Sequence, residues 1–136
     1  MRLQLTFGIH RATHQIGLFI QRSVPGLTQA EAHILCHLHE SKDATVAALH
    51  QAFAHRRSTL TSVLDRLAAA GLIAREPSQT DRRSFVISLT PAGRKKAAKV
   101  HRLLESLENS VLEGTGRRRL ELFNQLLHQL EQRAAQ

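Results

Sequence analysis

The chain has no tryptophan, no tyrosine and one cysteine among its 136 residues. A single cysteine excludes an internal disulfide and fits a reducing compartment, so we expect a cytoplasmic protein. No apolar stretch approaches the roughly 20 residues that cross a membrane, and His10, Arg11 and His14 interrupt any signal-peptide core. With aromatic residues at 4%, the core must consist mainly of aliphatic side chains, which favours helices over a β-sandwich.

Acidic residues are also in the minority. Nineteen Lys and Arg oppose eleven Asp and Glu, which leaves a formal net charge of +8 before the nine histidines are counted. A basic protein gains free energy on binding a polyanion, because each neutralised phosphate releases condensed counterions. Charge alone does not distinguish DNA, RNA and an anionic membrane, so the placement of the basic residues must decide.

Apolar residues recur every three or four positions through most of the chain, which is typical of helices with one apolar face. We expect the following helices: about 5–23, 28–40, a short one around 46–53, one that ends at Gly71, one from Pro91 to Gly114, and one ending near 134. Thr28 and Glu31 predict a reciprocal capping box, in which each side chain bonds the other residue's amide. Gly71 suits a helix end, and Thr90-Pro91 suits a helix start.

The apolar period changes between Gly71 and Thr90. Leu72–Glu76 and Phe85–Leu89 read as two strands, joined by a polar turn over Pro77–Arg83. Two short helices followed by such a hairpin have the order of a winged helix-turn-helix. The expected fold is therefore α+β, mostly α, and the second helix of the pair is expected to enter the DNA major groove.

The exposed face of that second helix carries groups that bind nucleic acid. With Leu60, Leu64 and Leu67 facing inward, the opposite face presents these residues: Arg57, Ser58, Thr61, Ser62, Asp65 and Arg66. Arginine can bind guanine through two parallel hydrogen bonds, and hydroxyls can reach bases or phosphates. At the turn, Asp81 can orient an arginine that enters the minor groove. The alternatives are a merely solvated helix face, and a charged hairpin that avoids pairing with other chains.

Six segments carry a more specific signal: Leu27-Thr28, Thr59-Leu60-Thr61, Leu64-Asp65-Arg66-Leu67, Gly71-Leu72-Ile73-Ala74-Arg75, Asp81-Arg82-Arg83, and Leu89-Thr90-Pro91-Ala92-Gly93. Together, and in this order, they resemble the MarR (multiple antibiotic resistance regulator) family. The resemblance covers nearly the whole chain. It implies a bacterial or archaeal homodimer that binds a short palindrome, usually as a repressor relieved by a small ligand or an oxidant.

The resemblance also implies an organisation and a set of contacts. One domain is expected over residues 1–136, with a winged-helix lobe at about 27–92 and dimerisation helices at about 5–23 and 91–134. The expected DNA-binding residues are Arg56, Arg57, Ser58, Thr59, Thr61, Ser62, Arg66, Arg75, Asp81, Arg82 and Arg83. Among them, Arg83 would enter the minor groove, held by Asp81, while Arg66 would lie near phosphate or brace the wing.

Other interpretations carry less support from the residues. The pairs His10/His14 and His33/His37 each share a helix face and suit zinc, but no further ligand pattern accompanies them, so no cofactor is expected and a zinc-responsive regulator stays an alternative. Cys36 lacks the neighbouring phenols of a peroxide sensor and is interpreted as a packing residue. Ser58, His55 and Asp65 do not suggest a triad in a pocket, so we expect no enzyme. A winged helix used only for protein contacts is the remaining alternative.

Overall fold

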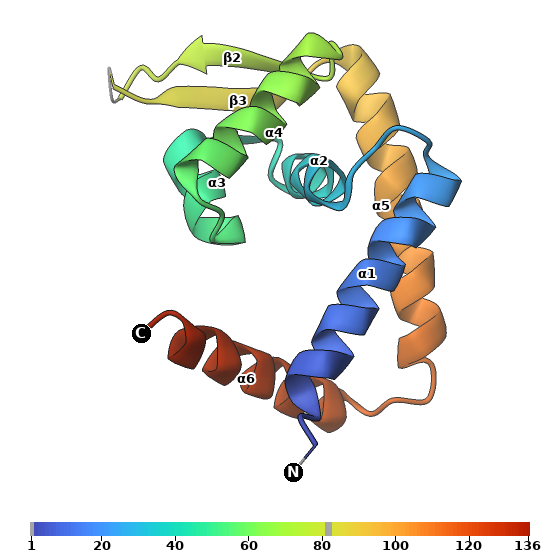
Figure 1. The fold of residues 1–136 in the computed structure, drawn as a ribbon. Helices are drawn as coiled ribbons and strands as arrows, with labels where there is room; N and C mark the ends of the chain where they lie inside the picture. The colour runs from blue at the N-terminus through green and yellow to red at the C-terminus, as the bar shows by residue number, and fades with distance from the viewer. Residues whose placement is uncertain (1, 81–82) are drawn as a thin grey trace. The chain divides into compact units, whose positions relative to one another are not determined.

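The computed structural model describes residues 2–80 and 83–136. Its elements follow in this order: α1 (Leu5–Ser23), α2 (Gln29–Ser41), β1 (Asp43–Thr45), α3 (Val46–Phe53), α4 (Arg57–Ala69), β2 (Ile73–Pro77), β3 (Phe85–Leu89), α5 (Pro91–Leu112) and α6 (Arg117–Ala134). Figure 1 shows these elements along the chain. The expected mostly helical α+β fold with a hairpin between the fourth and fifth helices is confirmed. No helix among the described residues is both long and apolar enough to cross a membrane.

The chain divides into two compact units, and the boundary lies inside α5. The first unit extends to Leu103 and contains the sheet, while the second extends from Leu104 to Gln136 and contains the end of α5 and α6. In the first unit, α2 and α4 each supply three of the largest fully buried side chains, more than any other element. The largest fully buried side chains are Ile34, Leu35, Leu38, Leu49, Leu60, Val63, Leu67, Ile87 and Val100.

The sheet is antiparallel, with β3 between β1 and β2. The second predicted strand coincides with β3, whereas the first lies one residue later than predicted, since Leu72 belongs to the turn that precedes β2. The strand β1 was not predicted, because the polar break after α2 has no alternating pattern. Its residues become a strand by pairing with β3, where Thr45 lies opposite Val86.

The junction between α4 and the hairpin is built from backbone contacts. Gly71 has a φ of +72°, and the amide of Leu72 donates to the carbonyl of Leu67 at 3.0 Å, which are the marks of a Schellman helix end. Thr90 Oγ1 donates to the Gly71 carbonyl at 2.6 Å and accepts from the amide of Gly93 at 3.0 Å. The predicted helix end at Gly71 and the predicted start at Thr90-Pro91 are therefore confirmed, and one threonine ties the two together.

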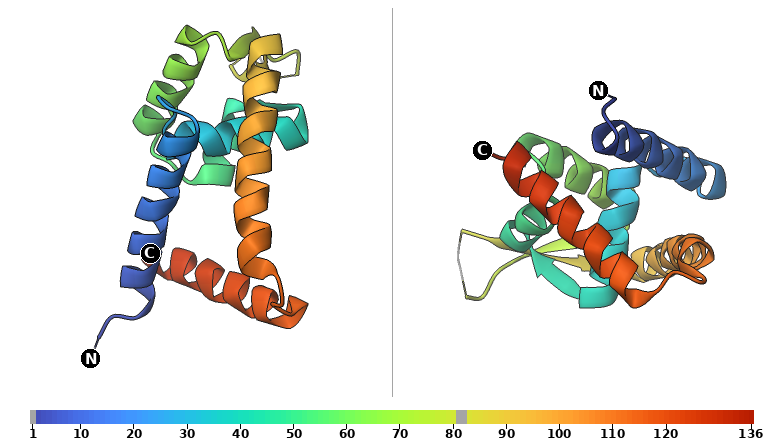
Figure 2. Two further views of the ribbon diagram at one scale, coloured as in Figure 1. Left: turned by 90° about the vertical axis from the view of Figure 1, so that its right-hand side faces the viewer. Right: turned by 90° about the horizontal axis from the view of Figure 1, so that it is seen from below.

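Gly93 allows this junction to close. A Cβ atom at Gly93 would collide with the carbonyl oxygen of Leu72 and lie 2.8 Å from its carbonyl carbon. The first turn of α5 therefore packs directly on the backbone that connects α4 to β2. In Figure 2 (left), the end of α4, the base of the hairpin and the start of α5 meet at one end of the first unit.

Apolar side chains stay exposed on the terminal helices. In α1 only Ile20 is buried, and Leu5 and Phe7 are 50% and 61% exposed. In the second unit, α6 has no buried residue, and Phe123 and Leu126 are 54% and 50% exposed. The stripe that predicted α1 is therefore only partly covered within the first unit.

Candidate nucleic-acid interface

The inward and outward faces of α4 are as the apolar spacing predicts. Leu60, Leu64 and Leu67 are buried, together with Val63, which the prediction omitted. The opposite side is exposed at every position that the sequence assigned to DNA: Arg57, Ser58, Thr59, Thr61, Ser62 and Arg66. Arg56 precedes the helix as its N-cap residue, in an extended conformation and also exposed. The buried leucines fix the orientation of α4 on the core, and its opposite face is accessible to a DNA groove.

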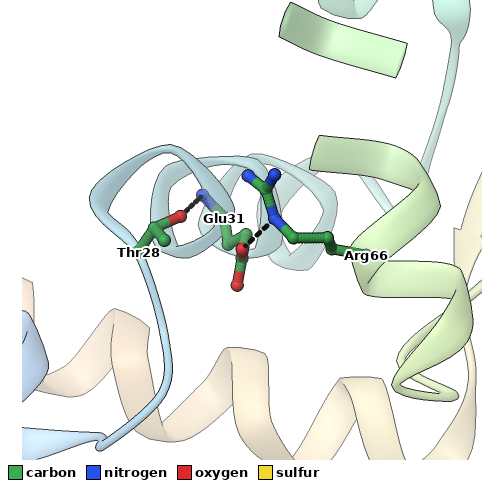
Figure 3. A network of polar contacts seen from close by, with 3 residues as sticks. All are labelled: Thr28, Glu31 and Arg66. Atoms are coloured by element: carbon green, nitrogen blue, oxygen red, sulfur yellow. Dashed lines mark hydrogen bonds and ion pairs between the residues drawn. The ribbon is translucent and has the colours of Figure 1, made fainter. Parts of the chain in front are cut away.

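Arg66 connects α4 to the core helix α2. Its Nε donates to Oε1 of Glu31 at 2.9 Å, and the Glu31 side chain is only 9% exposed (Figure 3). The Glu31 amide donates to Thr28 Oγ1 at 3.2 Å, so this half of the predicted capping box is confirmed. The other half is wrong, because the Glu31 carboxylate turns to the guanidinium of Arg66 and not back to Thr28.

The hairpin is connected to α4 by a different pair. Nη2 of Arg75, on β2, donates to Oδ1 of Asp65, on α4, at 2.6 Å. The expectation for Arg66 is a place near phosphate or a contact with the wing. In the structure Arg66 binds Glu31 on α2, and the contact between α4 and the wing is made by Asp65 with Arg75. Asp65 received no binding role from the sequence, and the residue that pairs with it lies ten positions further along the chain.

A pocket of about 450 Å³ lies between α3, the start of α4 and the start of β3. Its lining residues are Val46, Ala47, His50, Arg57, Leu60, Thr61, Arg83, Ser84 and Phe85. Two arginines, one from α4 and one from the segment that leads into β3, therefore border the same hollow. His50 was missed, because nothing in the local sequence around α3 indicates that it faces a pocket completed by residues seven to 35 positions later.

Part of the predicted wing lies outside the described residues. Asp81 and Arg82 belong to that part, so their expected roles stay predictions. The hairpin next to them is held by the amide of Ser78, which donates to the Ser84 carbonyl at 2.9 Å. Arg83, the residue before Ser84, is exposed.

The histidines considered as zinc ligands and the single cysteine can be judged by their surroundings. Within residues 2–80 and 83–136, no three His, Cys, Asp or Glu side chains gather as metal ligands. His37 packs edge-on against Phe53, with ring centroids 5.6 Å apart. Burial, with a smaller contribution from the charge of Glu40, raises the pKa of the Cys36 thiol from 9.0 to about 11. Cys36 is therefore a protonated, half-buried thiol at neutral pH, as expected of a packing residue.

Known proteins match this arrangement. A family model described as MarR family matches residues 27–85, which extend from the start of α2 to the start of β3. A probable transcriptional regulator from Pseudomonas aeruginosa is 25% identical, with a TM-score of 0.74, and the match covers 93% of this chain and 96% of that chain.

Two further solved structures are similar. BpsR from Bordetella bronchiseptica, whose DNA binding is regulated by 6-hydroxynicotinic acid, is 25% identical over 94% of this chain and 93% of its own, with a TM-score of 0.74. A MarR variant from E. coli in complex with operator DNA is 22% identical, with a TM-score of 0.73, and the match covers 93% of this chain and 92% of that chain. The latter likeness concerns the fold alone.

Proposed function

The winged-helix domain of this chain belongs to the MarR family, and from that premise we propose that the protein regulates transcription by binding duplex DNA as a homodimer. In this proposal α4 enters the major groove and the wing, which comprises β2, β3 and the turn between them, reaches the adjacent minor groove. The protein is a regulator and has no catalytic role.

The observation that carries the proposal is the shared placement of Arg57 and Arg83. Arg57 begins α4 and Arg83 precedes β3, and both line one pocket on an exposed surface. A site with two guanidinium groups and the Thr61 hydroxyl suits a phosphate-bearing ligand, because arginine binds phosphate through charge-assisted hydrogen bonds. The net charge of +8 adds attraction over a longer range.

The remaining contacts are assigned by position. Side chains at the start of α4 read bases or bind the flanking phosphates, and those of the wing bind the minor groove and its edges. The proposed contact residues are Arg56, Arg57, Ser58, Thr59, Thr61 and Ser62 on or before α4, Arg66 through its nitrogens that do not bind Glu31, and Asp81, Arg82 and Arg83 on the wing.

Dimerisation is proposed through the terminal helices, at about 5–23 and 91–134. The exposed Leu5 and Phe7 of α1, and separately Phe123 and Leu126 of α6, are large apolar side chains that a partner subunit would cover. Burying each of them would contribute about 1.5–3 kcal/mol. A two-fold dimer would read a pseudo-palindrome whose half-sites are about one helical turn apart, roughly 10 base pairs.

Repression relieved by a small ligand is the proposed mode of regulation. Support comes from the pocket of about 450 Å³, which an organic anion can fill, and from the ligand-regulated relative BpsR. An anion held by Arg57 and Arg83 would occupy the groups that bind DNA phosphate and would lower operator affinity. The class of ligand is thus an anion, and its identity is open to screening.

The test starts with selection of duplex fragments from genomic DNA by the purified protein. Footprinting of the selected fragments and light scattering of the free protein follow. We expect a symmetric footprint with two half-sites and the mass of a dimer. A monomer that selects no sequence at moderate salt would contradict the proposal.

A further inference from the structure

We propose that Asp65 and Arg75 position the wing relative to α4, and that Arg75 acts through Asp65 and does not itself bind DNA. This inference rests on the proposed function, because it concerns how the two DNA-binding elements are aligned. It changes the role expected for Arg75 from a DNA contact to a positioning residue.

The first argument is the number of connections between α4 and the hairpin. At the base, the Thr90 hydroxyl donates to the Gly71 carbonyl and the Thr90 amide donates to the Leu72 carbonyl, which joins the end of α4 to the end of the hairpin. The pairing of β1 with β3 holds the hairpin in the sheet as well, but this pairing makes no connection to α4. The 2.6 Å contact of Arg75 with Asp65 adds a second connection further along α4, and two connections define an angle. Figure 1 shows α4 and the hairpin side by side and converging at this base.

The second argument is the length of the hairpin beyond its base. A strand of five residues extends about 16 Å, so a rotation of the hairpin by about 10° relative to α4 displaces its turn by about 3 Å. The minor groove is only about 6 Å wide, and a displacement of half that width would move an inserted arginine out of place. A contact with little effect on stability can therefore have a measurable effect on DNA binding.

The third argument is the charge of Asp65. This carboxylate lies eight residues after Arg57 on the same exposed side of α4, about 12 Å further along the helix axis. An unpaired carboxylate beside DNA would repel phosphate. The Arg75 guanidinium neutralises the Asp65 carboxylate. Because its charge is already paired and its side chain is only 35% exposed, Arg75 is poorly placed to bind phosphate itself.

The test measures the operator affinity of Asp65→Ala, Asp65→Asn and Arg75→Ala over a range of salt concentrations. We expect each variant to bind about three- to five-fold more weakly, the size of effect that an exposed ion pair carries. The double variant Asp65→Ala/Arg75→Ala should bind no more weakly than either single variant. The exchanged pair Asp65→Arg/Arg75→Asp should recover part of the affinity.

The salt dependence separates positioning from direct contact. Removing a phosphate contact lowers the slope of log affinity against log salt by about 0.9, which is expected for Arg83→Ala but not for Asp65→Ala or Arg75→Ala. Lys99→Ala, which removes an exposed charge on α5, serves as the control for net charge. A slope reduced by about one in Arg75→Ala, or tighter binding by Asp65→Ala, would overturn the proposal.

Amide hydrogen exchange supplies a readout without DNA. Both single variants should exchange faster in β2 and β3 and at the wild-type rate in α2. Unchanged exchange in the hairpin would also overturn the positioning role. If the wild-type protein bound no duplex at all, the proposed function would fail while the exchange result still decided whether the pair holds the hairpin.

Discussion

Glu31 on α2 and Arg66 on α4 form an ion pair in which one partner is buried and the other is exposed. The Glu31 side chain is 9% exposed and that of Arg66 is 54% exposed, with Nε and Oε1 2.9 Å apart. A carboxylate that is largely removed from water depends on its partner, because an uncompensated buried charge loses its hydration.

Arg66→Ala is expected to lower the free energy of unfolding by about 1–2 kcal/mol, since it leaves Glu31 without its hydrogen-bond donor. The loss stays this small because solvent screens the exposed guanidinium. Arg57→Ala, at the exposed start of the same helix, should change stability little, because Arg57 forms no ion pair with a carboxylate of the described residues. Urea denaturation of both variants is the measurement. Equal stability of Arg66→Ala and wild type would show that Glu31 does not need this partner.

Gly93→Ala is expected to destabilise the protein by more than about 2 kcal/mol, because the added Cβ meets the rigid carbonyl group of Leu72. Gly8→Ala is the matched control, since a Cβ at Gly8 has no heavy atom within 4 Å. Thermal unfolding followed by circular dichroism measures both. If the two glycine variants unfolded at the same temperature, close packing at the α4–hairpin junction would be refuted.

Ala54→Gly is expected to stabilise the protein by up to about 1 kcal/mol. Ala54 lies between α3 and α4 with φ +52° and ψ +23°, in the left-handed region where a Cβ atom is disfavoured. Ala48→Gly, at an exposed position inside α3, should have the opposite sign and cost about 1 kcal/mol. Denaturant midpoints that moved in the same direction for both variants would contradict this prediction.

Cys36 is expected to react slowly with iodoacetamide at pH 7–8 and faster as the pH approaches its pKa of about 11. The folded state binds this proton more tightly than the unfolded chain, whose thiol has a pKa near 9.0. The stability that Cys36 contributes is therefore complete below pH 9 and is lost as the pH rises through about 11. A labelling rate that already reached its plateau near pH 8 would argue against a buried thiol.

Arg57→Ala and Arg83→Ala are expected to affect DNA binding differently. Loss of Arg57 should cost about 1–3 kcal/mol of binding free energy and relax the preference at one or two operator positions. Loss of Arg83 should weaken binding with less effect on the major-groove preference, and more strongly where the minor groove is narrow. Titrations on the selected operator and a scrambled duplex, at one salt concentration, compare the two. Identical losses on both duplexes for Arg57→Ala would exclude base reading by this residue.

Local chemistry determined much of this molecule. The bounds of α1, the end of α4 at Gly71, the start of α5 after Thr90 and the strand Phe85–Leu89 all follow from apolar spacing, capping residues and turn residues. Such signals act within a few residues of chain, so they can be read from the sequence without knowing what packs against it. The exposed face of α4, with Arg57 at its start, follows from the same spacing.

Tertiary packing decided which distant residues meet. Glu31 pairs with Arg66, 35 positions away, although its local sequence favoured a bond back to Thr28. Asp43–Thr45 forms a strand only because β3 lies beside it, and His50 faces Arg57 and Arg83 only because α3, α4 and the hairpin enclose one pocket. The free energy of each of these contacts depends on where the core places whole helices and strands, and no periodicity within a single segment carries that information.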